Sequence, residues 1–94
     1  MHNKTLKDAK NGNPEAQYEL AKCYYHGIGI EGDDSEAVKW FQKAAEQGHA
    51  EAQLDLARCY FYGIGVEEDD AEMVKWYQKA AEGGDAEAQY KLAK

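Results

Sequence analysis

Apolar residues recur along the chain at the spacing of an α-helix. Leu20, Cys23 and Tyr24 follow Ala16 at i+4, i+7 and i+8, which places these side chains on one side of a helix. A second stripe with helical spacing comprises Ala37, Trp40, Phe41, Ala44 and Ala45. The pattern predicts two amphipathic helices, over about residues 14–25 and 34–47, joined by a short glycine-containing loop. Because both tryptophans fall on apolar stripes, we expect Trp40 and Trp76 to pack inside the fold.

The residues that flank these stripes are typical helix ends. Asn13 is a favourable N-cap, and Pro14 suits the first turn of a helix. Gly27 suits a left-handed helix end, and Asp33 followed by Glu36 matches a capping box. Gly48 is expected to end the second helix. The equivalent end signals further along the chain are His49, Gly63, Gly84, Asp85, and Asp69 with Glu72. Within the loops, we expect the apolar side chains to lie under the turn; they are Ile28, Ile30, Ile64 and Val66.

The whole pattern is repeated after 36 residues. Residues 15–48 align with residues 51–84, and roughly two-thirds of the aligned positions are identical. A third copy begins near the C-terminus, and the first residues resemble the end of a unit. The sequence therefore predicts an all-α fold, an α/α solenoid of antiparallel helix pairs. We expect one domain over 1–94, with a partial unit at 1–13, repeats at 14–49 and 50–85, and a partial third repeat at 86–94.

Three motifs carry a resemblance to a known family. They are "PEAQ" at the start of the first helix, "LAKCYYHGIG" through the loop, and "AVKWFQKAAEQG" at the end of the unit. Together they resemble the Sel1-like repeat family, a relative of the tetratricopeptide repeat. The resemblance implies a right-handed superhelix whose first helices line a concave face, and adaptor work in assembling complexes or in signalling. Ala21 and Ala57 stand where the family commonly has glycine.

Composition limits the class of partner. The formal net charge is −7, with 18 acidic against 11 basic residues, and an acidic protein repels a phosphate backbone. We therefore expect no nucleic acid partner. Without a long apolar segment or a signal-peptide pattern, we also expect no membrane insertion and a cytoplasmic location. A chain that starts and stops inside a repeat resembles a fragment, so a secreted or periplasmic parent stays open.

Motifs for catalysis or metal binding are absent from the sequence. Ser35 has no lysine three residues later, and the three histidines form no HExxH pair. The acidic runs lack the spacing of an EF-hand. Cys23 and Cys59 occupy equivalent positions of successive units, where helices lie too far apart for a disulfide. We expect no enzyme activity, no cofactor, no metal and no disulfide.

By analogy with tetratricopeptide repeats, the first helices should present a partner-binding surface. The residues predicted for it are Tyr18, Lys22, Tyr25, His26, Leu54, Arg58, Phe61, Tyr62, Tyr90 and Lys94. Cations and aromatic rings form neighbouring columns, an arrangement suited to an extended peptide. In the alternative reading, Tyr25 and Phe61 pack against the neighbouring unit, and Lys22 pairs with Glu19 or Glu15.

The expected function is a non-enzymatic protein-protein interaction module, an adaptor or scaffold that binds a peptide or protein on this face. The alternative is a structural or consensus repeat scaffold, natural or designed, without a dedicated ligand. A separate expectation concerns the last helix, where Ala88 and Leu92 lack a covering unit. Such an edge favours head-to-tail self-association.

Overall fold

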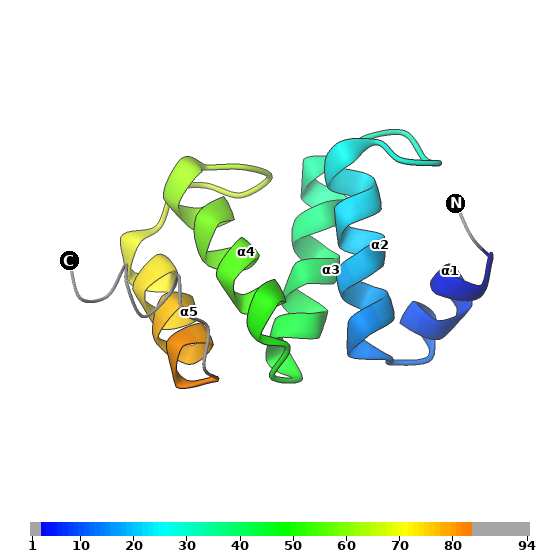
Figure 1. The fold of residues 1–94 in the computed structure, drawn as a ribbon. Helices are drawn as coiled ribbons and strands as arrows, with labels where there is room; N and C mark the ends of the chain where they lie inside the picture. Colours follow the sequence, from blue (N-terminus) through cyan, green and yellow to red (C-terminus); the bar gives the residue numbers. More distant parts are fainter. Residues whose placement is uncertain (1–2, 84–94) are drawn as a thin grey trace.

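The computed structural model describes residues 3–83, and these residues form five α-helices and no strand. The helices are α1 (Asn3–Lys10), α2 (Pro14–His26), α3 (Asp34–Glu46), α4 (Ala50–Tyr62) and α5 (Asp70–Glu82). They follow one another in a row, with α2 and α3 antiparallel and joined by a loop at one end (Figure 1). This arrangement confirms the predicted all-α fold of repeated helix pairs.

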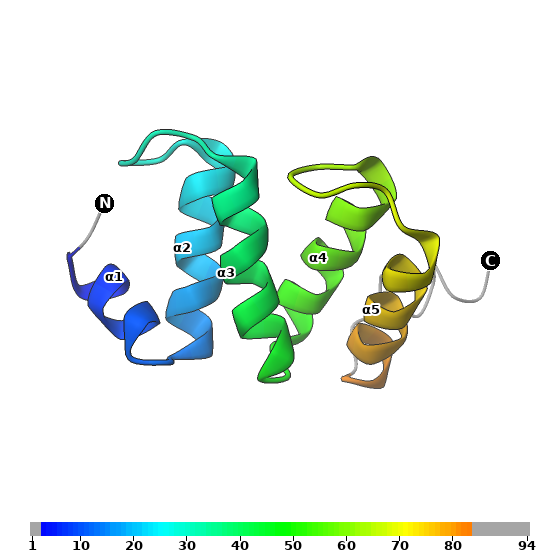
Figure 2. The ribbon, with the colours of Figure 1, turned by 180° about the vertical axis from the view of Figure 1, so that it is seen from behind.

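The first and second helices of the repeats lie in separate layers. In Figure 1, α2 lies in front of α3, and from behind α3 lies in front of α2 (Figure 2). The layer of α2 and α4 contains the predicted partner-binding residues between positions 18 and 62.

The predicted N-caps are present at four helices. Asn13 Oδ1 accepts a hydrogen bond from the backbone nitrogen of Ala16 at 2.9 Å, and His49 Nδ1 accepts one from Ala52 at 3.1 Å. A side-chain acceptor at this position satisfies a backbone N–H that has no partner within the helix. Asp69 Oδ1 caps α5 in the same way, at 3.1 Å from the nitrogen of Glu72. Asp85 lies outside the described residues.

The capping box before α3 is formed on one side only. Asp33 Oδ1 accepts from the backbone nitrogen of Glu36 at 3.1 Å. The reciprocal hydrogen bond is not needed, because the backbone nitrogen of Asp33 donates to the carbonyl of Tyr24 at 2.9 Å. Glu36 instead accepts a hydrogen bond from Lys39 at 2.8 Å. A backbone hydrogen bond from Asp33 to Tyr24 therefore closes the loop, and the side chain of Asp33 caps α3.

Glycine ends α2 and α4 as predicted. Gly27 and Gly63 adopt left-handed conformations with φ of 68° and 70°, a region that side chains with a Cβ rarely enter. Gly48, with φ of 90°, lies two residues beyond Glu46, the last residue of α3. Gly84 lies outside the described residues.

The prediction that the loop isoleucines lie under the turn is wrong for Ile28, which is 60% exposed. The equivalent Ile64 is half-buried and packs against the core. The second loop lies against the start of α3. The first loop has a shorter neighbour, because α1 has 8 residues where α3 has 13. Figure 1 shows α1 beside the lower half of α2, away from that loop.

Small and aliphatic side chains fill the space between the helices. Leu20 and Leu56 are completely buried, and several alanines at helix contacts are also fully buried, namely Ala21, Ala37, Ala44, Ala52, Ala57 and Ala80. Small residues at these contacts allow close approach of the helices. Trp76 is 3% exposed, and the half-buried Trp40 packs against the core. Both tryptophans therefore have the packing role that their helical positions predict.

Two buried glutamines connect each repeat to the segment before it. Gln17 Nε2 donates to the carbonyl of Ala9 at 3.1 Å, and Gln53 Nε2 donates to the carbonyl of Ala45 at 3.0 Å. Both glutamines are almost fully buried, so these hydrogen bonds offset the cost of removing the amides from water. This connection was not predicted, although the glutamine of the repeated "EAQ" was its visible signal.

Candidate functional site

A cavity of about 210 Å³ lies between α2 and α4. Its lining consists of Lys22, Tyr25, His26, Phe41, Asp55, Arg58, Cys59 and Ile64. We call it the α2–α4 pocket. Four of the predicted partner-binding residues line it: Lys22, Tyr25, His26 and Arg58. The structure thus brings side chains from equivalent helices of two repeats to one site.

Aromatic side chains remain exposed near the C-terminal ends of α2 and α4. Tyr25 is 41% exposed, Phe61 47% and Tyr62 62%. Neighbouring rings form edge-to-face pairs, with Tyr25 and His26 at 4.9 Å between centroids and Phe61 and Tyr62 at 4.8 Å. Tyr25 and Phe61 therefore keep much of their surface in solvent, where another molecule can reach them.

Tyr18 and Leu54 differ from their predicted exposure, because each is only 7% exposed. The ring of Tyr18 lies 4.6 Å from that of His49 and 5.9 Å from that of Phe41, measured between centroids. Tyr18 therefore lies between the two repeats, where it contacts Lys22 and Asp55 of the predicted surface from its buried side.

A carboxylate that the sequence analysis missed organises one side of the pocket. Asp55 accepts a hydrogen bond from the hydroxyl of Tyr18 at 3.0 Å and another from Arg58 Nη1 at 2.9 Å. Burial of the phenol, assisted by the negative charge of Asp55, raises the pKa of Tyr18 well above its usual range. The hydroxyl therefore stays protonated and donates a hydrogen bond to Asp55. The sequence did contain a signal for the contact between Asp55 and Arg58, because residues three positions apart lie on the same face of a helix.

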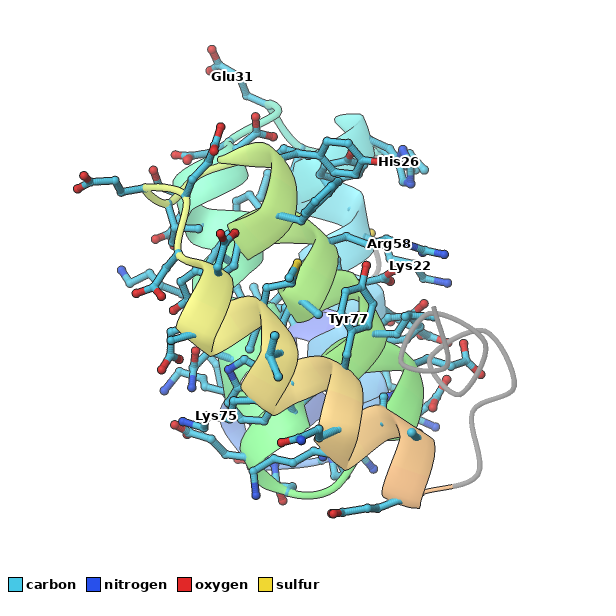
Figure 3. The ribbon with its side chains drawn as sticks, turned by 90° about the vertical axis from the view of Figure 1, so that its left-hand side faces the viewer. Lys22, His26, Glu31, Arg58, Lys75 and Tyr77 are labelled. Atoms are coloured by element: carbon cyan, nitrogen blue, oxygen red, sulfur yellow. The ribbon has the colours of Figure 1, made fainter. Side chains whose placement is uncertain are left out.

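Lys22 is held differently from Arg58. Its ammonium lies 4.6 Å from the centroid of the Tyr18 ring, in a cation–π contact. No carboxylate among residues 4–83 lies within ion-pair distance of Lys22. The alternative partner Glu15 pairs instead with His49 Nε2 at 2.7 Å. Figure 3 shows Lys22 and Arg58 near each other on one side of the molecule, His26 above them and Lys75 on the opposite side.

The thiol in the pocket is poorly suited to nucleophilic chemistry. Cys59 is 3% exposed. Burial, with a smaller contribution from Asp55, raises its pKa to about 12, so little thiolate exists at neutral pH. Cys23 and Cys59 are both free cysteines. Within the part of the chain that the structure describes, no group of three or more His, Cys, Asp or Glu side chains is arranged to hold a metal ion.

Some predicted residues lie outside the described part of the chain. These are Tyr90 and Lys94 of the partner-binding set, and Ala88 and Leu92 of the proposed self-association edge. For the helices in residues 3–83, none has the length and apolar character needed to cross a membrane.

The chain belongs to the Sel1 repeat family. The family's sequence model matches residues 14–49, 50–85 and 86–94. Sel1 repeats are generally protein-interaction modules, and proteins built from them are generally non-catalytic scaffolds. A search of curated proteins found no match.

Solved structures of Sel1-type proteins resemble this chain closely. A Sel1 repeat protein from Oxalobacter formigenes is 40% identical with a TM-score of 0.91, over 95% of this chain and 26% of that one. A protective antigen from uropathogenic Escherichia coli, with an SLR fold, is 41% identical with a TM-score of 0.90, over 94% and 19%. Cysteine rich protein B of Helicobacter pylori shares the fold, at 23% identity and a TM-score of 0.86, over 89% and 63%. The chain thus spans about a quarter or less of the first two proteins.

Proposed function

We propose that this chain is a protein-interaction module that binds a peptide or protein segment on the face formed by α2 and α4. The observation that carries the proposal is the α2–α4 pocket, which has two cations at its sides and exposed aromatic rings near its opening. Aromatic and arginine side chains at a partly enclosed site are the usual anchors of protein interfaces.

Two features of the surface support a peptide over a small polar ligand. Tyr25 lines the pocket and is 41% exposed, and Phe61 and Tyr62 are exposed on α4, so a ligand that extends beyond the pocket can gain further contact area. The side chains around it are also anchored from below. Asp55 holds Arg58, and Tyr18 holds both Asp55 and Lys22. Anchored side chains lose less conformational freedom on binding, which favours affinity.

The test is a selection from a displayed peptide library with the purified chain as bait. The pocket variant carries Lys22→Ala, Tyr25→Ala, Arg58→Ala and Phe61→Ala. A matched control carries Lys39→Ala, Val74→Ala, Lys75→Ala and Gln78→Ala, four exposed positions of α3 and α5. Both variants have two cations fewer than the native chain, and circular dichroism checks that both remain helical.

We expect the native chain and the control to enrich the same peptides, and the pocket variant to enrich none of them. If all three proteins enrich the same peptides, binding occurs elsewhere. If the native chain enriches none, the chain acts as a scaffold without a peptide ligand on this face.

A further inference from the structure

We propose that the α2–α4 pocket takes one bulky apolar side chain of the bound segment, and that Lys22 binds an acidic side chain next to it. This inference rests on the proposed function and names the class of segment: an internal stretch of peptide with an aromatic or large aliphatic residue flanked by Asp or Glu.

The apolar half of the proposal follows from the floor of the pocket. Phe41 and Cys59 line it and are 2% and 3% exposed, and the half-buried Ile64 closes one side. These groups offer no charged partner to a ligand. A cavity of about 210 Å³ accommodates a single large side chain and not a compact group of several. Filling it with apolar surface is favourable because water is released from both partners.

The acidic half follows from the environment of Lys22. The Tyr18 ring holds the ammonium from one side at 4.6 Å, and no carboxylate among residues 4–83 lies within ion-pair distance of it. Asp55 lines the same pocket, but its carboxylate accepts hydrogen bonds from Tyr18 and Arg58. Arg58 differs, because Asp55 already offsets its charge at 2.9 Å. Lys22 is therefore the cation on which an incoming carboxylate gains most. Its donors complement an anion, and the half-buried position reduces competition from water.

The proposed ligand is an internal stretch of peptide, so its anion is the carboxylate of an Asp or Glu side chain. Arg58, at the position equivalent to Lys22 in the next unit, already pairs with Asp55 at 2.9 Å. The acidic contact is therefore assigned to Lys22.

Long-range attraction does not explain such a preference. The whole chain carries a formal net charge of −7, which repels an acidic peptide at a distance and attracts a basic one. Any preference for acidic peptides must therefore arise from contacts at the site. This makes a single substitution at Lys22 a sharp test.

The experiment uses three synthetic peptides of equal length with blocked ends and Gly-Ser flanks. Their central residues are Glu-Phe-Glu, Gln-Phe-Gln and Glu-Ala-Glu. Fluorescence polarisation gives the affinities, and amide shifts in a ¹⁵N spectrum locate the binding surface. We expect the Glu-Phe-Glu peptide to bind at least about tenfold more tightly than either of the others, as one charged hydrogen bond or one buried ring provides.

Two variants test whether Lys22 causes the preference for acidic side chains. In Lys22→Gln, the advantage of Glu-Phe-Glu over Gln-Phe-Gln should disappear, while the advantage over Glu-Ala-Glu remains. The matched control is Lys39→Gln, a lysine of α3 in the other layer, which should retain both advantages.

The inference is overturned if Gln-Phe-Gln or Glu-Ala-Glu binds as tightly as Glu-Phe-Glu, or if none of the three peptides shifts the amides of α2 and α4. The library selection then decides the proposed function separately. Library peptides that bind the α2–α4 face without an acidic and apolar pair leave the proposed function standing, whereas the absence of any bound library peptide removes both.

Discussion

The loop after α2 and the loop after α4 have nearly the same sequence but different surroundings. Ile28 in the first loop is 60% exposed, whereas Ile64 in the second is half-buried against the core. The second loop rests on α3, where Gly65 lies directly beside the Asp34 carbonyl and Val38. Since the two loops share the "GIG" motif, the difference in burial comes from the neighbour that each loop meets.

Equivalent valines of α3 and α5 show a similar contrast. Val38 of α3 is 7% exposed, and Val74, its equivalent in α5, is 41% exposed. A repeat buries its apolar faces only against adjacent repeats. Equivalent residues of the two units should therefore contribute unequally to stability. The predictions below test individual residues at or near the contacts between units.

The largest effect is expected at Gly65. Its φ is 71°, and an added Cβ would overlap the Asp34 carbonyl and lie 3.0 Å from Val38 Cγ2. We expect Gly65→Ala to lower the free energy of unfolding in urea by about 2–5 kcal/mol, from backbone strain and overpacking together. Gly27→Ala is the control, because φ is similar and no atom comes closer than 3.6 Å to its added Cβ. Equal losses in the two variants would show that the close approach to α3 does not matter.

Val38 and Val74 form the second comparison. We expect Val38→Ala to lower the free energy of unfolding by about 1.5–3 kcal/mol, because a buried side chain loses its contacts with the second loop. Val74→Ala should cost less than about 1 kcal/mol. Chemical denaturation of both variants measures the difference, and a larger loss at Val74 would contradict the assigned burial.

The burial of Cys59 can be tested by thiol chemistry. Burial raises the pKa of Cys59 to about 12 from an ordinary value of 9.0. Raising the pH toward 12 should therefore increase the thiolate fraction and the rate of its reaction. At pH 8 we expect Cys59 in the Cys23→Ser variant to react with a disulfide reagent about 30-fold or more slowly than after unfolding in urea. A rate unchanged by unfolding would show that the thiol is accessible in the folded protein.

The caps of α2 and α4 allow a smaller comparison. His49→Ala should lower the free energy of unfolding by about 1 kcal/mol, because the backbone nitrogen of Ala52 loses its acceptor. His49→Asn should preserve most of the stability, since Asn13 performs this role at α2. If His49→Asn is as unstable as His49→Ala, the pair with Glu15 is the main contribution of His49.

The smallest effect is expected at Gly83, which stands where the first unit has Gln47. Gln47 Nε2 donates to Gln17 Oε1 at 2.8 Å, and a glycine cannot supply the equivalent hydrogen bond to Gln53. Gly83 has φ of −80°, which any residue adopts. Gly83→Gln should therefore raise the free energy of unfolding by about 0.5–1 kcal/mol. Gly83→Ala separates the backbone contribution, and an equal gain in both variants would exclude the side-chain hydrogen bond.

Much of the local structure could be predicted because it depends on neighbours in the sequence. Asn13, Gly27 and Asp33 act within one turn of their own helices, so their roles follow from residue type and position. The 36-residue repeat then indicated the helix pairs and the family. Within the candidate site, the same periodicity assigned Lys22 and Arg58 to one surface, and both line the α2–α4 pocket.

The errors concern residues whose surroundings are distant in the sequence. Helical phase placed Tyr18 and Leu54 on the exposed face, but each is only 7% exposed. The hydrogen bond between Tyr18 and Asp55 joins residues 37 positions apart. Spacing within a single helix contains no information on such a contact.

The sequence by itself determined the helices, their ends, the repeat length and the all-α repeat architecture, because each of these depends on interactions within one unit. Only the tertiary structure decided which copy of a shared residue is buried, which cation of the pocket pairs with Asp55, and where a pocket opens between α2 and α4. Those properties arise at the contact between units, where identical residues meet different neighbours.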